Sequence, residues 1–273
     1  MEKTLLPQIT IRGQEFSRLV VGANTINGGS HLSRFTNNQM KRYFTKEQIF
    51  SHLRDCEQAG INTWQSSYGN LDLYQEYKDQ GGKLQYISLG GETDNEPGNL
   101  KKAYASGVSG IAHHGEITDQ LFKSGQFNKV KEFCKSVRDT GMLVGVSSHM
   151  PDAVELIINE NWDVDFFMCC IYERHRTREE LKKMMGYVPI PVSEVYLESD
   201  PARMFRVMNK TEKPCFAFKI LAAGRLCDNQ ETVEQAFSST FTQIKNQDAV
   251  IVGMYPEYED QVALNAGYVK KYG

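Results

Sequence analysis

Short apolar runs recur eight times along the chain, and most are followed by a stretch whose apolar residues recur with helical spacing. Unbroken apolar runs of about four to eight residues are typical of strands buried on both faces, as in a parallel sheet. The predicted strands span residues 18–23, 61–64, 85–89, 109–112, 142–146, 164–171, 215–218 and 249–252. Strands that alternate with helices in this way predict βαβ units.

Helix start signals between the runs support this pattern. The segments that begin at Thr45 and Thr177 match a capping box, in which side chains satisfy free backbone amides. Asp200, followed by proline, is a further start signal. The 273 residues carry no evident linker and suffice for a (β/α)₈ barrel, which takes about 250 residues. We therefore predict an α/β fold, with one TIM-barrel domain spanning residues 1–273.

Polar side chains follow most of the predicted strands, and a closed barrel would bring them to one rim. They are Asn24, Gln65, Ser66, Ser67, His113, His114, Glu116, Ser147, Ser148, His149 and Lys219. Two long polar segments, residues 24–44 and 172–199, would leave the same rim, and long loops of compact domains are usually functional or disordered. We expect a site at this rim, with the two segments as its lids.

The charge balance narrows the classes of partner. The formal net charge is −3 and the pI is about 6.1, so neither nucleic acid nor an anionic membrane surface is expected to bind. No apolar run approaches the roughly 20 residues that span a bilayer, and the N-terminus lacks a signal-peptide core, which predicts a cytoplasmic protein. The six cysteines lack CxxC spacing and are expected to be buried, reduced thiols. A small molecule is the expected partner, while the oligomeric state stays open.

Several segments, taken in order along the chain, resemble the aldo/keto reductase family. QITIRGQEFSRLVVGAN (8–24) is similar to the N-terminal hairpin and first strand of that family, GINTWQSS (60–67) to its second strand, and GVSSH (145–149) to its GVSNF segment. FAFKILAAGRL (216–226) and VIVGMYPEYEDQVALNA (250–266) resemble its last two strand regions. The resemblance implies a barrel with an N-terminal β-hairpin and NAD(P)H as cofactor.

The family uses Asp, Tyr, Lys and His at the barrel mouth, and this sequence departs from that set. Gln65 stands at the Asp position, and the Lys position falls near Leu89 or Gly90. Tyr68 is the candidate for the family Tyr, with Tyr74 as the alternative, and the family His falls at His113 or His114. The resemblance therefore implies a divergent member whose chemistry differs from standard carbonyl reduction.

The positions that bind cofactor in the family are partly matched. Ser147 and Phe218 fit the residues that contact the nicotinamide amide and stack on its ring, and Asn265 matches a terminal Asn. Where the family has a cation for the 2′-phosphate of NADPH, this chain has Tyr255 and Glu257, and a carboxylate there would repel a phosphate.

The rim residues also allow other chemistry. One divalent metal ion could bind His113, Glu116 and His149 together. Alternatively, the histidines could pack in the barrel wall, contact substrate or act as acid and base. Since neighbouring residues of a strand point to opposite sides, only one of His113 and His114 can face the barrel axis. Lys219 among apolar residues could be a base or an imine-forming nucleophile, or could only reach solvent.

Three hypotheses of function follow. The leading one is a divergent aldo/keto-reductase-like enzyme that acts on a small polar, carbohydrate-derived molecule. In it His113 or His114, Glu116, His149 and Lys219 carry acid–base chemistry, with a divalent metal ion as an optional aid. The alternatives are an NAD(P)H-dependent oxidoreductase that reduces a carbonyl and a ligand-binding barrel without catalytic activity.

Overall fold

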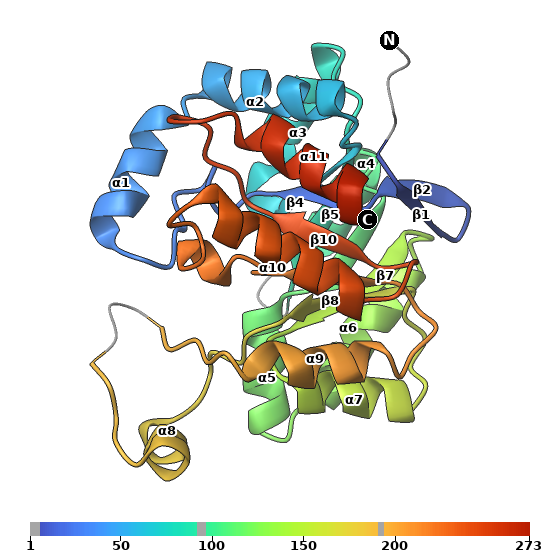
Figure 1. Ribbon diagram of the computed structural model, residues 1–273. Helices are drawn as coiled ribbons and strands as arrows, with labels where there is room; N and C mark the ends of the chain where they lie inside the picture. The colour runs from blue at the N-terminus through green and yellow to red at the C-terminus, as the bar shows by residue number, and fades with distance from the viewer. Residues whose placement is uncertain (1–5, 92–96, 191–193) are drawn as a thin grey trace.

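Eight parallel strands close into a barrel, which confirms the predicted fold (Figure 1). This computed structural model describes residues 6–91, 97–190 and 194–273. The strands neighbour one another in the order β10-β3-β4-β5-β6-β7-β8-β9. Their bounds are β3 (Leu19–Gly22), β4 (Thr63–Ser67), β5 (Gln85–Gly90), β6 (Gly110–His113), β7 (Leu143–Ser148), β8 (Phe166–Cys170), β9 (Cys215–Phe218) and β10 (Ala249–Val252).

Helices follow the strands and surround the barrel (Figure 1). They are α1 (Arg34–Tyr43), α2 (Lys46–Ala59), α3 (Leu71–Asp79), α4 (Pro97–Ala105), α5 (Gly115–Lys123), α6 (Asn128–Arg138), α7 (Pro151–Asn159), α8 (Arg178–Met185), α9 (Asp200–Met208), α10 (Gln230–Gln243) and α11 (Gln261–Tyr272). Thr45 caps α2 and Thr177 forms a capping box on α8, as predicted. At α9 the cap is Ser199, one residue before the predicted Asp200.

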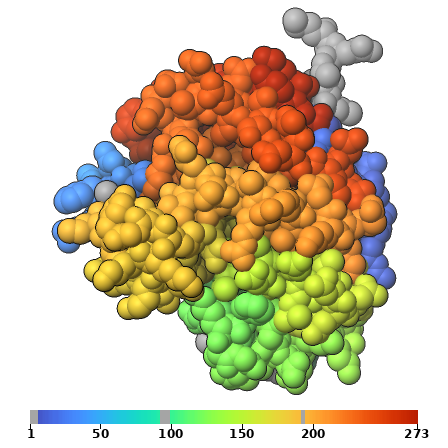
Figure 2. Space-filling model, turned by 60° about the horizontal axis from the view of Figure 1, so that its bottom comes forward, coloured from blue at the N-terminus to red at the C-terminus, as the bar shows by residue number. Residues whose placement is uncertain are grey.

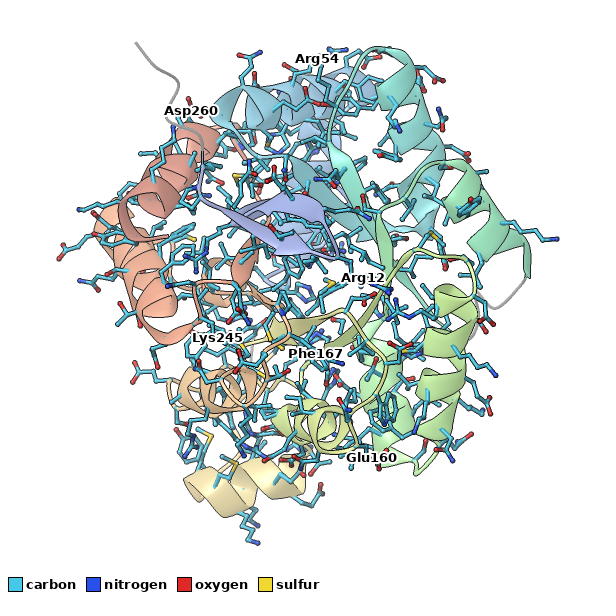
Figure 3. All side chains as sticks on the ribbon, turned by 90° about the vertical axis from the view of Figure 1, so that its right-hand side faces the viewer. Arg12, Arg54, Glu160, Phe167, Lys245 and Asp260 are labelled. Atoms are coloured by element: carbon cyan, nitrogen blue, oxygen red, sulfur yellow. The ribbon has the colours of Figure 1, made fainter. Side chains whose placement is uncertain are left out.

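A β-hairpin closes the N-terminal end of the barrel, in agreement with the predicted hairpin (Figure 3). Its strands are β1 (Gln8–Ile11) and β2 (Gln14–Ser17), and its turn has positive φ angles at Arg12 and Gly13. The hairpin contributes Ile9, Ile11 and Phe16 to a buried cluster. The other members of that cluster are Val20, Ile87, Ala112, Leu143, Phe166, Met168, Phe216, Ala249 and Ile251. The barrel interior is thus filled and plugged at this end, so only the opposite rim is left for a site.

Four strands run further than their apolar runs predict: β5 and β6 end one residue later, at Gly90 and His113, and β4 and β7 extend further still. Gln65, Ser66 and Ser67 belong to β4, and Ser147 and Ser148 belong to β7, whereas the sequence placed them after the strands. Most of these side chains are buried, and they are satisfied locally: Ser66 Oγ accepts from Asn70 at 2.7 Å. A polar residue with a nearby partner can stay in the strand, which apolar patterning alone does not detect.

The two predicted lid segments carry structure of their own. The first contains α1, and the second contains α8, which forms a yellow lobe on the surface (Figure 2). Five cysteines are buried as expected, whereas Cys227 is exposed. Within the described ranges no helix is both long and apolar enough to cross a membrane.

Candidate active site at the barrel rim

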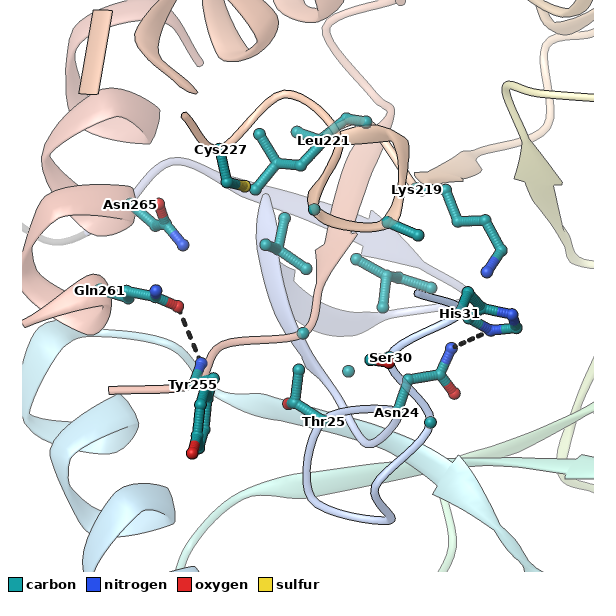
Figure 4. Close-up of a pocket in the computed structure, with 18 of the residues that line it drawn as sticks. Asn24, Thr25, Ser30, His31, Lys219, Leu221, Cys227, Tyr255, Gln261 and Asn265 are labelled. Carbon is teal, nitrogen blue, oxygen red and sulfur yellow. Dashed lines mark hydrogen bonds between the residues drawn. The ribbon is translucent and has the colours of Figure 1, made fainter. Parts of the chain in front are cut away.

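A pocket of about 310 Å³ opens at the C-terminal ends of β3, β9 and β10 (Figure 4). Its walls come from the first lid segment, from the turn after β9 and from α11. The polar and aromatic residues that line it include Asn24, Ser30, His31, Gln65, Phe218, Lys219, Tyr255, Gln261 and Asn265. A concave, largely apolar pocket with a few polar groups is the usual form of a small-molecule site.

Lys219 follows β9 directly and reaches into this pocket (Figure 4). Its Nζ is buried and has no hydrogen-bond partner among the described residues. Burial is the main cause that lowers the pKa of Lys219 to about 8; Cys170 and Glu194 raise it, and Arg174 and Arg225 lower it. The backbone φ of 61° is unusual for a residue other than glycine, and such strained residues cluster at functional sites.

His31, from the first lid segment, lies beside this amine. Its Nδ1 is 3.1 Å from Glu194 Oε1, and its Nε2 is 3.4 Å from the side-chain nitrogen of Asn24. Because an ionised carboxylate only accepts hydrogen bonds, Nδ1 of His31 is the donor to Glu194. Lys219 points toward this ring, so an amine and an imidazole share one end of the pocket (Figure 4).

Arg174, from the second lid segment, connects Glu194 to the barrel. Its Nε lies 2.9 Å from Glu194 Oε1, and its Nη1 lies 3.2 Å from His149 Nε2. Burial raises the pKa of Glu194, but its hydrogen bonds and the charge of Arg174 outweigh burial and hold that pKa well below its ordinary value. A continuous chain of charged and polar contacts therefore runs from His31 through Glu194 and Arg174 to His149.

That chain ends on a buried Asp119–His149 pair. His149 Nδ1 donates to Asp119 Oδ2 at 2.7 Å, and Ser148 Oγ donates to Asp119 Oδ1 at 2.6 Å. Burial raises the pKa of Asp119, but hydrogen bonds from His149 and His175 outweigh it and lower this pKa to about 2. Burial also lowers the pKa of His149. The pair is thus a carboxylate beside a neutral imidazole, and the Nε2 of that imidazole faces Arg174.

One group of described residues could hold a metal ion. Asp119, His149 and His175 each offer a ligand atom, and these atoms lie within 4.8 Å of one another. However, both oxygens of Asp119 already accept hydrogen bonds, and the Arg174 guanidinium adjoins His149. A cation here would be repelled by this fixed positive charge, so the donor set suits a hydrogen-bonded network better than a metal ion.

The predicted metal set of His113, Glu116 and His149 differs from the metal-capable group found among the described residues, which contains His149 but neither His113 nor Glu116. His113 lies at the end of β6 with its Nδ1 2.7 Å from Thr118 Oγ1, and its ring packs edge-on against Phe133 of α6. Burial lowers the pKa of His113 to about 4. His113 is therefore a neutral residue of the barrel wall, because it occupies the face of the strand that the helices cover.

His114 and Glu116 lie at the start of α5. His114 is the N-cap residue, and its Nδ1 accepts from the backbone nitrogen of Glu116 at 3.2 Å. Glu116 Oε2 is 3.2 Å from Arg174 Nη2 and 3.3 Å from His175 Nε2. Glu116 thus joins the polar chain around Arg174, while His114 has a structural role at the helix terminus.

Gln65 and Tyr68 occupy different surroundings. Gln65 lines the pocket, and its Nε2 donates to the backbone oxygen of Ser66 at 2.8 Å. Tyr68 packs against Gly90, where a Cβ would approach the phenol oxygen to 2.7 Å. Gly90 lies where the family resemblance implies a lysine, and here its missing side chain makes room for the tyrosine.

Two of the three predicted cofactor residues line the pocket. Phe218 lines the pocket and packs edge-on against His149. Asn265 projects into the pocket from α11 (Figure 4). Ser147 does not line it: its hydroxyl packs against Gly115, where a Cβ would come within 2.9 Å. Tyr255 also lines the pocket, and its backbone nitrogen donates to Gln261 Oε1 at 2.8 Å.

Fold and pocket together define this chain as a (β/α)₈-barrel protein with a small-molecule cavity at its C-terminal rim. Phospho-2-dehydro-3-deoxyheptonate aldolase from Thermotoga maritima is similar, with a TM-score of 0.58 and 10% identity over 98% of this chain and 72% of that one. A truncated 3-deoxy-D-arabino-heptulosonate 7-phosphate synthase from the same organism gives 0.54 and 12%, covering 98% and 91%. Yersinia pestis DHPS gives 0.50 and 9%, covering 96% and 95%. Such identities show a shared fold alone. No family model and no curated protein sequence matches the chain.

Proposed function

We propose that the protein is an enzyme that acts on a small polar molecule in the rim pocket, with Lys219 as its proton-transferring group. The observation that carries this proposal is that Lys219 lines the pocket while its buried Nζ has no hydrogen-bond partner in the described chain. An amine with a pKa of about 8 exchanges protons readily near neutral pH. A lysine whose role was only to hold the fold together would be expected to pair with a carboxylate.

The other pocket residues then have defined roles. His31 is the second group that can exchange a proton, and Asn24 and Gln65 are neutral partners for substrate hydroxyl or carbonyl groups. His149 is a positioning residue, since its Nε2 faces Arg174 and acts on His31 only through Arg174 and Glu194. This assignment retains the predicted importance of Lys219 and His149 but gives them different tasks.

A turnover screen tests the proposal. The purified protein is incubated with a panel of small hydroxylated aldehydes, ketones and acids, and consumption is followed by mass spectrometry. Lys219→Met is expected to lower kcat by about 10²-fold or more, as for loss of a general acid or base. The matched control is Lys213→Met, because Lys213 lies just before the opposite end of β9 and its Nζ donates to Trp162 O; its turnover should equal that of the native chain.

The screen also separates the alternatives. Equal turnover by Lys219→Met and the native chain would contradict the proposal. Thermal stabilisation by a panel compound without turnover would favour the non-catalytic ligand-binding barrel.

A second candidate function is an oxidoreductase that binds a nicotinamide dinucleotide. The observation that favours it is the extent of the pocket, which runs from Gln65 and Lys219 to Gln261 and Asn265 on α11. Phe218 could pack against the nicotinamide, which supplies hydride transfer when bound, and Asn265 could hold the far end. Glu259 lies in the wall near α11, so a 2′-phosphate would be repelled. Calorimetry should then show that NADH binds more tightly than NADPH. A loss of NADH affinity in Asn265→Ala would support this function.

A further inference from the structure

We propose that Lys219 is a covalent nucleophile, which forms an imine with a small hydroxylated aldehyde or ketone bound in the rim pocket. This inference rests on the proposed function, because it names the substrate class of the same site. In this reaction Lys219 does more than transfer a proton, because its nitrogen forms a covalent bond to the substrate.

The geometry around the amine favours this reaction. Nζ is removed from solvent and is not engaged by a carboxylate, and Lys219 is one of the residues that line the pocket of about 310 Å³. Among the described residues that line the pocket, the one carboxylate is Glu259, which belongs to the α11 side. The left-handed φ of Lys219 and the hydrogen bond from Ala222 N to Lys219 O, 2.7 Å long, fix the turn that carries the side chain.

The surroundings also keep the amine reactive. The cations Arg174 and Arg225 oppose protonation, the thiol of Cys170 and the carboxylate of Glu194 favour it, and burial lowers the pKa to about 8. Near pH 7 an amine of that pKa is neutral in roughly one molecule in ten, against about one in three thousand for an ordinary lysine. Only the neutral amine has the lone pair that attacks a carbonyl.

The reaction balances with groups at the site. The Nζ lone pair attacks the carbonyl carbon, a C–N bond forms, and the carbonyl π electrons move to the oxygen. The nitrogen then loses one proton and the oxygen takes one, which gives a neutral carbinolamine whose nitrogen again has a lone pair. The hydroxyl then leaves as water after a second protonation, while the nitrogen lone pair forms the C=N bond of the iminium ion. His31 is placed to carry these protons, because its ring lies at the end of the Lys219 side chain (Figure 4). Asn24 and Gln65 are positioned to bind hydroxyl groups of the substrate.

Reductive trapping tests the inference. The full chain is incubated near neutral pH with dihydroxyacetone or glyceraldehyde and sodium cyanoborohydride, which delivers hydride to the iminium carbon and leaves a stable secondary amine. Peptide mass spectrometry then measures the labelling rate of each lysine. We expect Lys219 to be labelled at least about tenfold faster than any other lysine, because its neutral fraction is larger.

Lys213 provides the matched comparison in the same sample. Burial also lowers the pKa of Lys213, but its Nζ donates to Trp162 O at 2.7 Å and does not line the pocket. Slow labelling of Lys213 and unchanged labelling of Lys219 in Lys213→Arg would therefore assign the reactivity to the pocket and not to burial alone.

Four outcomes would overturn the inference, and the fourth combines the labelling with the turnover screen. In the first, labelling follows solvent exposure; in the second, Lys213 is labelled as fast as Lys219. In the third, Lys219 stays unlabelled while inorganic phosphate stabilises the native chain but not Lys219→Met, which would make Lys219 an anion-binding group. If turnover needs Lys219 but no lysine is trapped, the proposed function stands and the imine is wrong. If Lys219 is trapped but no compound of the screen is turned over, the imine stands and the proposed function is wrong.

Discussion

Lys219 and His31 illustrate how single residues acquire their properties from distant parts of the chain. Lys219 is a candidate for chemistry because it follows strand β9 at a buried position. Burial, Arg174 and Arg225 lower the pKa of its amine there, whereas Glu194 raises it. The apolar run before Lys219 predicted that this lysine lies at the end of a buried strand. The sequence offered no comparable signal for His31 or for Asp119, since their partners, Glu194 and His149, are 163 and 30 residues away.

Replacement of Lys219 by methionine should stabilise the fold at neutral pH. The pKa of Lys219 is lowered from 10.5 to about 8, so the folded chain disfavours the proton that the unfolded chain keeps. A shift of this size corresponds to roughly 3 kcal/mol at pH values below 8. As pH rises from about 8 to 10.5 the native chain gains stability, because the unfolded state still binds a proton that the folded state has already lost. Urea unfolding should therefore show Lys219→Met more stable by about 1–3 kcal/mol at pH 7, with a difference that shrinks toward pH 10.5. If the difference in unfolding free energy did not change with pH, or if Lys219→Met were less stable at pH 7, the lowered pKa of a buried Lys219 would be contradicted.

At the scale of elements, the sequence predicted the strands well because these strands are buried on both faces. The runs 215–218 and 249–252 coincide with β9 and β10. The ends of β4 and β7 were not predicted, since Ser66 and Ser148 are buried with hydrogen-bond partners that periodicity does not reveal. The two lid segments were predicted only as long polar segments, because the contacts between them depend on the closed barrel. Residues of the first segment line the pocket, whereas no described residue of the second segment does.

Arg225 joins the two lid segments to the turn after β9. Its Nη2 donates to the backbone oxygens of His31 and Glu194, each at 3.2 Å, and its guanidinium lies 4.1 Å from the centre of the Tyr196 ring. Arg225→Ala should therefore loosen both lids, with a loss of stability of about 1–2 kcal/mol from the cation–π contact and hydrogen bonds. Trypsin should cleave the segment 172–199 faster in this variant than in Arg206→Ala, a change on an exposed residue of α9. Equal cleavage of the two variants would show that Arg225 does not hold the lids.

At the scale of the whole molecule, one end of the barrel is closed by the hairpin and the other carries the pocket. Phe16 of β2 packs edge-on against Phe216 at the closed end, with ring centres 6.3 Å apart. Lys213 and Lys219 lie near opposite ends of β9, yet only Lys219 lines the pocket. The direction of the parallel strands alone therefore decides which of two similar lysines is available for chemistry.

Acid should destabilise the molecule over the pH range in which its two most strongly shifted histidines would take up protons. Burial lowers the pKa of His52 and of His113 from 6.5 to about 4. Between pH 6.5 and about 4 the unfolded chain binds protons that the folded chain refuses, so stability falls with pH by up to roughly 3 kcal/mol for each histidine. His52→Leu should remove one of these contributions, since the His52 ring is buried beside Phe44. Denaturant unfolding of the native chain and this variant at pH 7 and pH 4.5 measures the difference; parallel losses of stability would exclude His52 as a source.

The pKa of Lys219 is the most direct test of the account, and it can be measured without knowledge of the substrate. In a chain labelled with ¹³C at the lysine Cε atoms, NMR titration follows each amine separately. We predict one resonance that titrates near pH 8, is missing from Lys219→Met and is retained in Lys213→Met. If the resonance that Lys219→Met removes titrated near pH 10.5 instead, Lys219 would be an ordinary solvated lysine, and both the proposed catalysis and the imine would be wrong.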